Sequence, residues 1–284
     1  MPLTAVPSNG VRRVVPLTFG WEDLPQTISI HGGDASVRLR EPVPGVLLQL
    51  DGGWLLLDTG FNVPLVRDPM LRQRFHGRNH GIFAELLDDP RDSLEVAFET
   101  VGIDPADVVV VALSHLHNDH AGGLRWFAER VPVHLQRREL DYGLHGGTPG
   151  HGPEQNGFIR IDYDDPNVDW QLADGEVEVA PGVLAVPTYG HTPGHQSFVV
   201  TLTPDAASSY GVPGFVLAFD AADLQRNIDE ELPVGGFIDC PPEQTVEAIR
   251  RLKAIGAERG YRLVPGHDPD VWPAFTKELG VPGP

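Results

Sequence analysis

The segment His115-Leu116-His117-Asn118-Asp119-His120 places three histidines and an aspartate within six positions. Buried imidazoles each need a hydrogen-bonding or metal partner, so structural roles alone explain such a cluster poorly. Neutral imidazole and carboxylate are ligands that suit zinc and other borderline divalent metal ions. We therefore expect this segment to form a metal site.

Further candidate ligands follow predicted strands elsewhere in the chain. The cluster itself comes after a valine-rich run, Asp107 to Leu113, which predicts a strand buried on both faces. His191, Asp220 and His267 follow the predicted strands Leu184–Pro187, Phe215–Phe219 and Leu263–Val264. Each of these three residues alone could be an ordinary turn residue. Together with the cluster they suffice for two metal ions, with Asp220 as a carboxylate that could bridge them.

The rest of the chain alternates short apolar runs with turns rich in Gly and Pro, a pattern typical of many strands. Strands are predicted at Val46–Leu50 and Trp54–Leu57, as a hairpin around Asp51-Gly52-Gly53, and also at Val131–Gln136, within Val177–Pro187, at Ser197–Leu202 and at Arg262–Val264. Helices are predicted at Ser93–Val101, with Asp92 or Ser93 as N-cap, at Gly122–Arg130, and at Glu243–Ile255, where Gly256 would end the helix. Strands and helices in both halves predict an α/β sandwich of two packed sheets with helices outside. No linker divides the chain, so we expect a single domain over residues 1–284, with a long surface loop at Gly143–Gly157.

Composition limits the possible partners and location. The net charge of -19 argues against nucleic acid and against an anionic membrane surface, and it is explained by solubility or by a cleft that concentrates cations. No apolar run is long enough to span a membrane. A single cysteine, Cys240, excludes an intramolecular disulfide, and the first twenty residues lack the pattern of a secretion signal. We expect a cytoplasmic monomer or homodimer that acts on a small molecule.

The extended motif Ser114-His115-Leu116-His117-Asn118-Asp119-His120-Ala121-Gly122-Gly123 resembles the His-x-His-x-Asp-His signature of the metallo-β-lactamase superfamily. The resemblance continues through Leu57-Asp58-Thr59-Gly60, Gly190-His191, Asp220 and Gly266-His267. Within that superfamily, the stretches Gly190–Ser197 and Phe219–Ala222 are similar to the N-acyl-homoserine lactone lactonases, which are quorum-quenching enzymes.

The resemblance implies an αββα sandwich, with two mixed β-sheets flanked by helices, and a dinuclear zinc site. The implied ligands of one zinc ion are His115, His117 and His191, and those of the other are Asp119, His120 and His267, with Asp220 bridging. Asp58 would steady the ligand loop, and His195 would orient neighbouring groups rather than bind metal. The implied reaction is the opening of a lactone ring by a metal-bridging hydroxide, with Asp119 passing a proton to the leaving oxygen.

One position departs from the lactonase pattern. Those enzymes usually have a tyrosine three residues after the bridging aspartate, whereas this chain has Asp223. A carboxylate donates poorly to a developing oxyanion unless its pKa is raised enough to keep it protonated. Either another group donates, with Tyr189 as a candidate substrate contact, or the substrate differs from the typical one. Apolar residues between Phe61 and Leu87 could form a wall for an acyl tail or could be ordinary core.

Other functions remain open at this point. The same scaffold could hydrolyse an aryl lactone, another ester, a thioester, a β-lactam or a phosphoester, because fold does not determine substrate. An iron-dependent oxidoreductase is a second class, although a mononuclear iron site needs fewer ligands than this chain offers. A binding module without activity is a third class, but such proteins tend to lose ligands, and all seven are present here.

Overall fold

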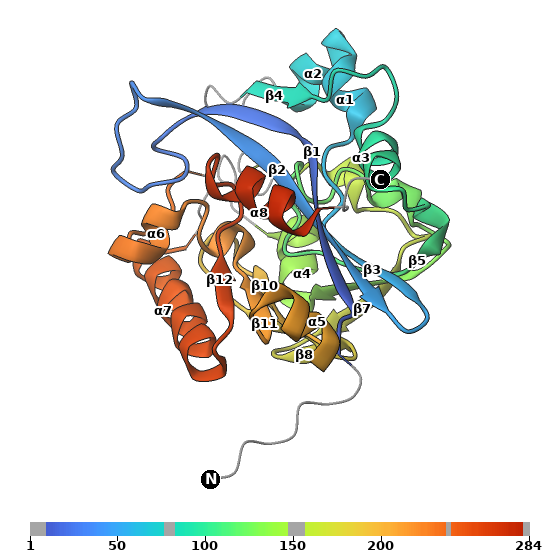
Figure 1. Ribbon diagram of the computed structural model, residues 1–284. Coiled ribbons are helices and arrows are strands. Elements are labelled where there is room, and N and C mark those ends of the chain that lie inside the picture. The colour runs from blue at the N-terminus through green and yellow to red at the C-terminus, as the bar shows by residue number, and fades with distance from the viewer. Residues whose placement is uncertain (1–9, 77–82, 147–156, 237–239, 281–284) are drawn as a thin grey trace.

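The computed structural model describes residues 10–76, 83–146, 157–236 and 240–280, and Figure 1 shows how their helices and strands are arranged. The strands are β1 (Arg13–Pro25), β2 (Arg38–Leu50), β3 (Gly53–Leu57), β4 (Phe83–Leu86), β5 (Val108–Ala112), β6 (Pro132–Gln136), β7 (Asp169–Ala173), β8 (Val177–Ala180), β9 (Val183–Pro187), β10 (Gln196–Thr201), β11 (Gly214–Leu217) and β12 (Arg262–Val264). The α-helices are α1 (Val63–Arg67), α2 (Pro69–Phe75), α3 (Ser93–Val101), α4 (Arg137–His145), α5 (Pro204–Tyr210), α6 (Gln225–Glu230), α7 (Pro242–Arg259) and α8 (Val271–Leu279).

The described strands form two mixed sheets. One has seven strands in the order β4-β1-β2-β3-β5-β6-β7, and the other has five in the order β12-β11-β10-β9-β8. In the larger sheet β3, β5, β6 and β7 run parallel, so their carboxyl ends share one edge. In the smaller sheet β10 is antiparallel to both β9 and β11, and β12 is parallel to β11, so β9, β11 and β12 share a direction.

Three apolar clusters separate the layers of the fold. Successive side chains of a strand point to opposite faces, so Val15 of β1 packs in the same cluster as Phe98 of α3. Its neighbour Val14 lies in a second cluster, between the sheets, with Phe198 of β10. A third cluster on the outer face of the smaller sheet contains Ile249 of α7. The layer order is therefore helix, sheet, sheet, helix, which confirms the predicted αββα sandwich.

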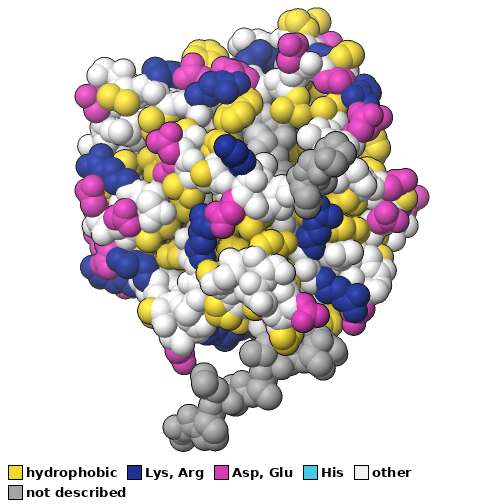
Figure 2. All heavy atoms as spheres, viewed as in Figure 1, with side chains coloured by type: hydrophobic (Ala, Val, Ile, Leu, Met, Phe, Trp, Pro, Cys, Tyr) yellow, Lys and Arg dark blue, Asp and Glu magenta, His cyan; other side chains and the backbone are white. Residues whose placement is uncertain are grey.

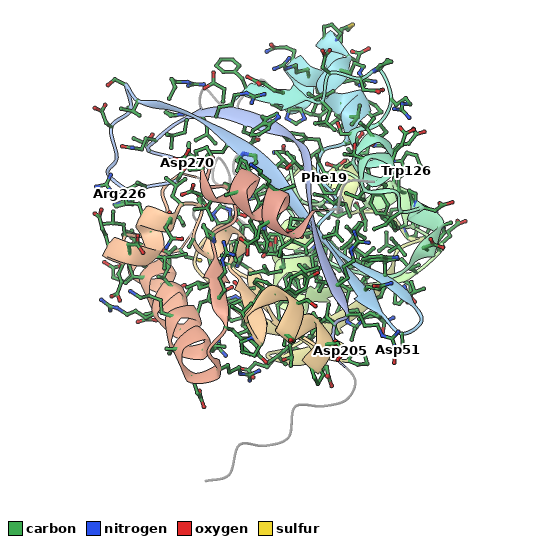
Figure 3. All side chains as sticks on the ribbon, viewed as in Figure 1. Phe19, Asp51, Trp126, Asp205, Arg226 and Asp270 are labelled. Atoms are coloured by element: carbon green, nitrogen blue, oxygen red, sulfur yellow. The ribbon has the colours of Figure 1, made fainter. Side chains whose placement is uncertain are left out.

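Several predicted elements are present in the structure. The helix Ser93–Val101 has the predicted bounds; the Asp92 side chain accepts a hydrogen bond from the Leu94 N–H, and Gly102, at φ 68°, ends it. The hairpin around Asp51-Gly52 joins β2 to β3, and Figure 3 shows Asp51 at its tip. The strand predicted at Asp107–Leu113 is β5, which is shorter, at Val108–Ala112; Asp107 ends a 3₁₀ helix, and Val109 is 41% exposed, so the strand is not buried along its whole length.

Two predicted helices differ from the structure. The segment Gly122–Arg130 forms only a short 3₁₀ helix, Leu124–Trp126, within turns. This segment packs closely on the backbone of Asn62: a Cβ atom at Gly122 would lie 2.0 Å from the Asn62 nitrogen. Gly256 does not end the last long helix; α7 continues to Arg259, and Gly260 ends it at φ 67°. Gly256 is inside the helix, where its missing side chain lets the carbonyl of Tyr261 approach.

Two further predictions concern irregular segments. The predicted strand Phe215–Phe219 ends at Leu217, and Phe219–Ala221 form a 3₁₀ turn that carries Asp220. The expected loop Gly143–Gly157 is wrong at its start, because Gly143 to His145 belong to α4. Residues 147–156 of that expected loop lie outside the described residues.

Charged side chains of both signs lie on the outer surface (Figure 2). Figure 2 shows acidic and basic side chains interspersed on the visible face. Among the described residues, no helix has the length and apolar character needed to cross a bilayer.

Candidate metal centre

The seven expected ligands come together where strands of both sheets end. His115, His117, Asp119 and His120 follow β5, His191 follows β9, Asp220 follows β11 and His267 follows β12. All seven are buried and fall into two groups. One group is His115, His117, His191 and Asp220, and the other is Asp119, His120 and His267. Within each group the potential ligand atoms lie within 4.8 Å of one another.

The first group converges around one carboxylate oxygen of Asp220. His191 Nε2 lies 2.9 Å from His117 Nδ1. Asp220 Oδ2 lies 3.3 Å from His191 Nε2 and 3.8 Å from His115 Nε2. Three imidazole nitrogens and one carboxylate oxygen therefore surround a point that a metal ion could occupy.

The second group surrounds the other oxygen of the same carboxylate. Asp220 Oδ1 lies 3.1 Å from His267 Nε2 and 3.2 Å from His120 Nε2. Asp119 Oδ2 lies 3.0 Å from His120 Nε2. Because its two oxygens face different groups, Asp220 stands in the position of a bridging carboxylate.

The chemistry of these donors fits divalent metal ions. Burial lowers the pKa values of His115 and His117 well below the usual range, so both imidazoles are neutral, the form that binds metal. His115 Nε2 is buried and has no hydrogen-bond partner among the described residues. Burial would also lower the pKa of His267, but the Asp220 carboxylate outweighs it and raises this pKa to about 10. Each of the two buried ligand groups therefore suits one metal cation, which would take the place of protons on the ligand atoms.

Asp58 holds the ligand segment from behind. Its side chain accepts hydrogen bonds from the Ser114 N–H at 2.6 Å and the Ser114 hydroxyl at 2.7 Å, and its Oδ2 lies 2.7 Å from His120 Nδ1. Asp58 is buried and has a left-handed backbone at φ 59°, which is uncommon for a residue other than glycine. It orients the His120 ring so that Nε2 points toward the second group.

His195 is buried but belongs to neither group. Its Nδ1 lies 2.9 Å from the Thr188 hydroxyl, which is 2.8 Å from the Ser197 hydroxyl, and Ser197 donates to the Ala218 carbonyl. Burial lowers the pKa of His195 to about 3, so its ring is neutral. This chain of hydrogen bonds connects β9, β10 and β11 beneath the ligand loops.

Glu139, on α4, is an important residue that the sequence interpretation missed. Its carboxylate accepts hydrogen bonds from the backbone N–H groups of Leu116 and Gly194 and from the Thr192 hydroxyl. It therefore ties the segment that carries His115 and His117 to the loop that carries His191. The only local signal was a glutamate three residues after the strand Pro132–Gln136, in the first turn of α4.

A small cavity, with about 30 Å³ of space open to water, lies beside the two groups. Asp223 lines it, together with Asp119, Asp220 and two glutamates that were not predicted, Glu22 and Glu41. The described residues between Phe61 and Leu87 do not line it; Phe61 is buried in the core and Met70 is 83% exposed.

Tyr189 does not line this cavity either, contrary to the expected substrate contact. Its ring lies under the Arg138 guanidinium, and its hydroxyl is 3.4 Å from Gln136 Oε1. The cation–π contact keeps the tyrosine in a separate surface pocket.

Comparison with known proteins places this site in a family. Residues 39–205 match the model of the metallo-beta-lactamase superfamily. The N-acyl homoserine lactonase AttM of Azorhizobium caulinodans is 33% identical over an alignment of 246 residues, and the match covers 84% of this chain and 86% of the relative. The N-acyl homoserine lactonase AiiA of Bacillus thuringiensis subsp. kurstaki is 31% identical over an alignment of 238 residues, and the match covers 81% of this chain and 82% of the relative.

Solved structures show the same likeness. An N-acyl homoserine lactone hydrolase with the product N-hexanoyl-L-homoserine bound at its catalytic metal center superposes with a TM-score of 0.77 at 27% identity. The match covers 96% of this chain and 98% of that one. The resemblance inferred from the His115–His120 motif is confirmed, and this chain belongs to the metallo-beta-lactamase superfamily.

Proposed function

We propose that this protein is a dinuclear metal-dependent hydrolase that opens the ring of an N-acyl homoserine lactone or a related lactone. The observation that carries the proposal is the position of Asp220, whose Oδ1 and Oδ2 face two separate groups of buried ligands. The similarity to N-acyl homoserine lactonases over more than four fifths of the chain supports the substrate class.

We assign His115, His117 and His191 to one metal ion, Asp119, His120 and His267 to the other, and Asp220 to both. Zinc is the proposed metal, because histidine nitrogens with carboxylate oxygens suit it and no cysteine joins the described groups. When bound, such ions polarise a carbonyl oxygen and lower the pKa of water so that it can attack near neutral pH.

The residues of the chain supply positioning and proton transfer. Asp58 fixes the ring of His120, and Glu139 fixes the two loops that carry the other histidines. Asp119 lines the cavity beside Asp220, so its carboxylate is placed to take a proton from the attacking water. It would return that proton to the ring oxygen as the carbonyl carbon–oxygen bond breaks, which leaves a hydroxy acid as product.

We also propose that residues 1–284 form one domain, because the ends of the described chain pack on each other: the Trp272 ring of α8 donates a hydrogen bond to the Leu17 carbonyl of β1. A cytoplasmic location and a monomeric or homodimeric state are further proposals; for the location, the basis is the single cysteine.

The direct test combines metal analysis with a substrate panel. We expect about two zinc ions per chain and turnover of acyl-homoserine lactones, with loss of activity on chelation and recovery with zinc. Asp220→Ala should lose at least one metal ion and nearly all activity. The matched control is Glu258→Gln, at an exposed position of α7.

Three outcomes would contradict the proposal. One iron ion per chain would favour an oxidoreductase. Inactivity on every lactone, with turnover of a thioester, β-lactam or phosphoester, would assign another hydrolase. Retention of both metal ions in Asp220→Ala would remove its bridging role.

A further inference from the structure

Three carboxyl side chains that are not candidate ligands line the cavity beside the metal centre. Glu22 is on β1, Glu41 is on β2, and Asp223 follows the turn that carries Asp220. They are 9%, 2% and 4% exposed, respectively. Glu22 and Glu41 are partners in the β1–β2 register, so two acidic residues lie directly opposite each other on neighbouring strands. Such a pair would destabilise the sheet if both carboxyl groups were ionised, and burial raises the pKa of each.

The protein itself provides little compensation for these groups. Glu41 accepts one hydrogen bond, from the Ser29 hydroxyl. Asp223 Oδ1 is buried and has no hydrogen-bond partner among the described residues. A buried carboxyl group offers acceptor oxygens whether or not it is protonated, and leaving them unsatisfied is costly. The cavity therefore presents unfilled acceptors to whatever occupies it.

The other residues that line the cavity indicate which chemical groups could bind in it. No lysine or arginine among the described residues lines the cavity, which disfavours an anionic group there. Within the described part of the chain, the apolar side chains that line the cavity are those of Leu24 and Ile28, which offer little surface to an alkyl tail. A third metal ion is not indicated, because the described groups with metal-ligand spacing do not include Glu22, Glu41 or Asp223.

We propose that Glu22, Glu41 and Asp223 form a recognition wall for substrates that carry hydrogen-bond donors, hydroxyl or amine groups, close to the carbonyl that is hydrolysed. This inference rests on the proposed lactonase function, because that function places the carbonyl beside Asp220. A secondary amide supplies one N–H group to this wall, whereas an amine or several hydroxyl groups would satisfy more of its oxygens. The wall selects the part of the substrate next to the ring and leaves the acyl tail to lie outside the cavity.

The test uses three γ-butyrolactones of similar size that carry a methyl, hydroxyl or amino group on the carbon next to the carbonyl. A pair of N-acyl homoserine lactones, with hexanoyl and 3-hydroxyhexanoyl chains, extends the comparison. For the metal-loaded enzyme and each variant, kcat/KM is measured for every lactone. The readout is kcat/KM for the donor-bearing lactone divided by kcat/KM for its donor-free partner. Dividing this ratio by the wild-type ratio cancels differences in intrinsic reactivity between the lactones.

Two kinds of substitution separate charge from hydrogen bonding. Glu22→Gln and Asp223→Asn keep an acceptor oxygen but remove the charge, whereas Glu22→Met and Asp223→Leu remove both. We expect the apolar variants to lower the ratio about tenfold or more for hydroxyl and amino lactones. The wild-type wall disfavours a lactone that leaves its buried acceptor oxygens unpaired, and the apolar variants lack those oxygens. If the wall acts through charge, the amide variants lower only the amino ratio. Glu258→Gln is the control, and metal content and circular dichroism show that each variant is loaded and folded.

The outcomes distinguish this inference from the function on which it rests. Lactone turnover with ratios that stay unchanged in all four variants overturns the wall and leaves the lactonase function standing. If wild type hydrolyses no lactone, the proposed function fails, and calorimetric binding of the same amino and methyl lactones then tests the wall. Equal affinities for these two compounds, or affinities unchanged in the apolar variants, overturn it.

Discussion

The carboxylate of Glu139 accepts a 3.1 Å hydrogen bond from the backbone N–H of Leu116, the residue between the first two histidines of the metal centre. The same carboxylate accepts from the Gly194 N–H and the Thr192 hydroxyl, both at 2.8 Å. Burial raises the pKa of Glu139 to about 7, and its three donors oppose that rise. One buried side chain of α4 thus sets the distance between two ligand loops.

Glu139→Gln tests that role. The amide replaces one acceptor oxygen by an NH₂ group that would face backbone N–H donors, so the two loops should separate while the fold is kept. We expect metal affinity to fall about 10- to 100-fold, as for other residues that support ligands. Competition with a zinc-binding dye measures it. Asp141→Asn, at an exposed position of the same helix, is the control; equal affinities of the two variants would show that Glu139 is not needed.

Asp58→Asn should weaken the second metal group selectively. Asp58 Oδ2 lies 2.7 Å from His120 Nδ1, and an amide would no longer hold the ring with a charged acceptor. We expect one metal ion per chain to be lost first during dialysis against a chelator, while the group of His115, His117 and His191 keeps its ion. Elemental analysis at successive times measures this loss. Asp51→Asn, at the exposed hairpin tip in Figure 3, should match wild type, and equal loss from both groups would contradict a local role.

The ligand set could be predicted from the sequence because its signals are local. Four of the seven residues lie in one six-residue segment, and each of the others comes soon after a short apolar strand. The parallel direction of β3 and β5 and the shared direction of β9, β11 and β12 then bring those strand ends together.

The recognition wall of Glu22, Glu41 and Asp223 could not be predicted in this way. Glu22 is in a strand whose pattern is interrupted by Pro16 and Gly20, so β1 itself was not recognised. Its approach to Glu41 depends on the β1–β2 register, which pairs residues from strands joined by a long connection. Similarly, Tyr189 adjoins His191 in sequence, but its contact with Arg138 turns it away from the cavity. Long-range register and side-chain packing, rather than local pattern, decide these positions.

Gly194→Ala should disturb the His191 loop through its backbone. A Cβ atom at Gly194 would lie 2.2 Å from the backbone nitrogen of Glu139 and 2.5 Å from its Cα, so α4 and the loop would have to separate. Overpacking of this kind costs about 1–3 kcal/mol. We expect a lower free energy of urea unfolding together with weaker metal binding. Gly52→Ala, where a Cβ atom would meet nothing within 4 Å, should change neither, and a neutral effect at Gly194 would mean that the loop is not tightly packed.

Asp162 should make stability depend on pH at a distance from the metal ligands. Burial raises the pKa of this carboxyl from 3.8 to about 7, against the opposing effects of a hydrogen bond from Asn62 and the charge of Arg125. Between these values the folded chain keeps a proton that the unfolded chain releases, so this group makes the free energy of unfolding fall as pH rises. The fall is at most about 1.4 kcal/mol per pH unit.

Asp162→Asn removes that dependence, because the amide cannot ionise and its carbonyl oxygen can still accept from Asn62. We expect the variant to gain stability relative to wild type as pH rises from 4 to 7, with little further change above pH 8. Urea unfolding of both proteins at each pH measures the difference, and Asp141→Asn controls for loss of an exposed charge. A difference that is constant over this range would mean that Asp162 is already ionised in the folded protein, held by Arg125 and Asn62 against the cost of burial.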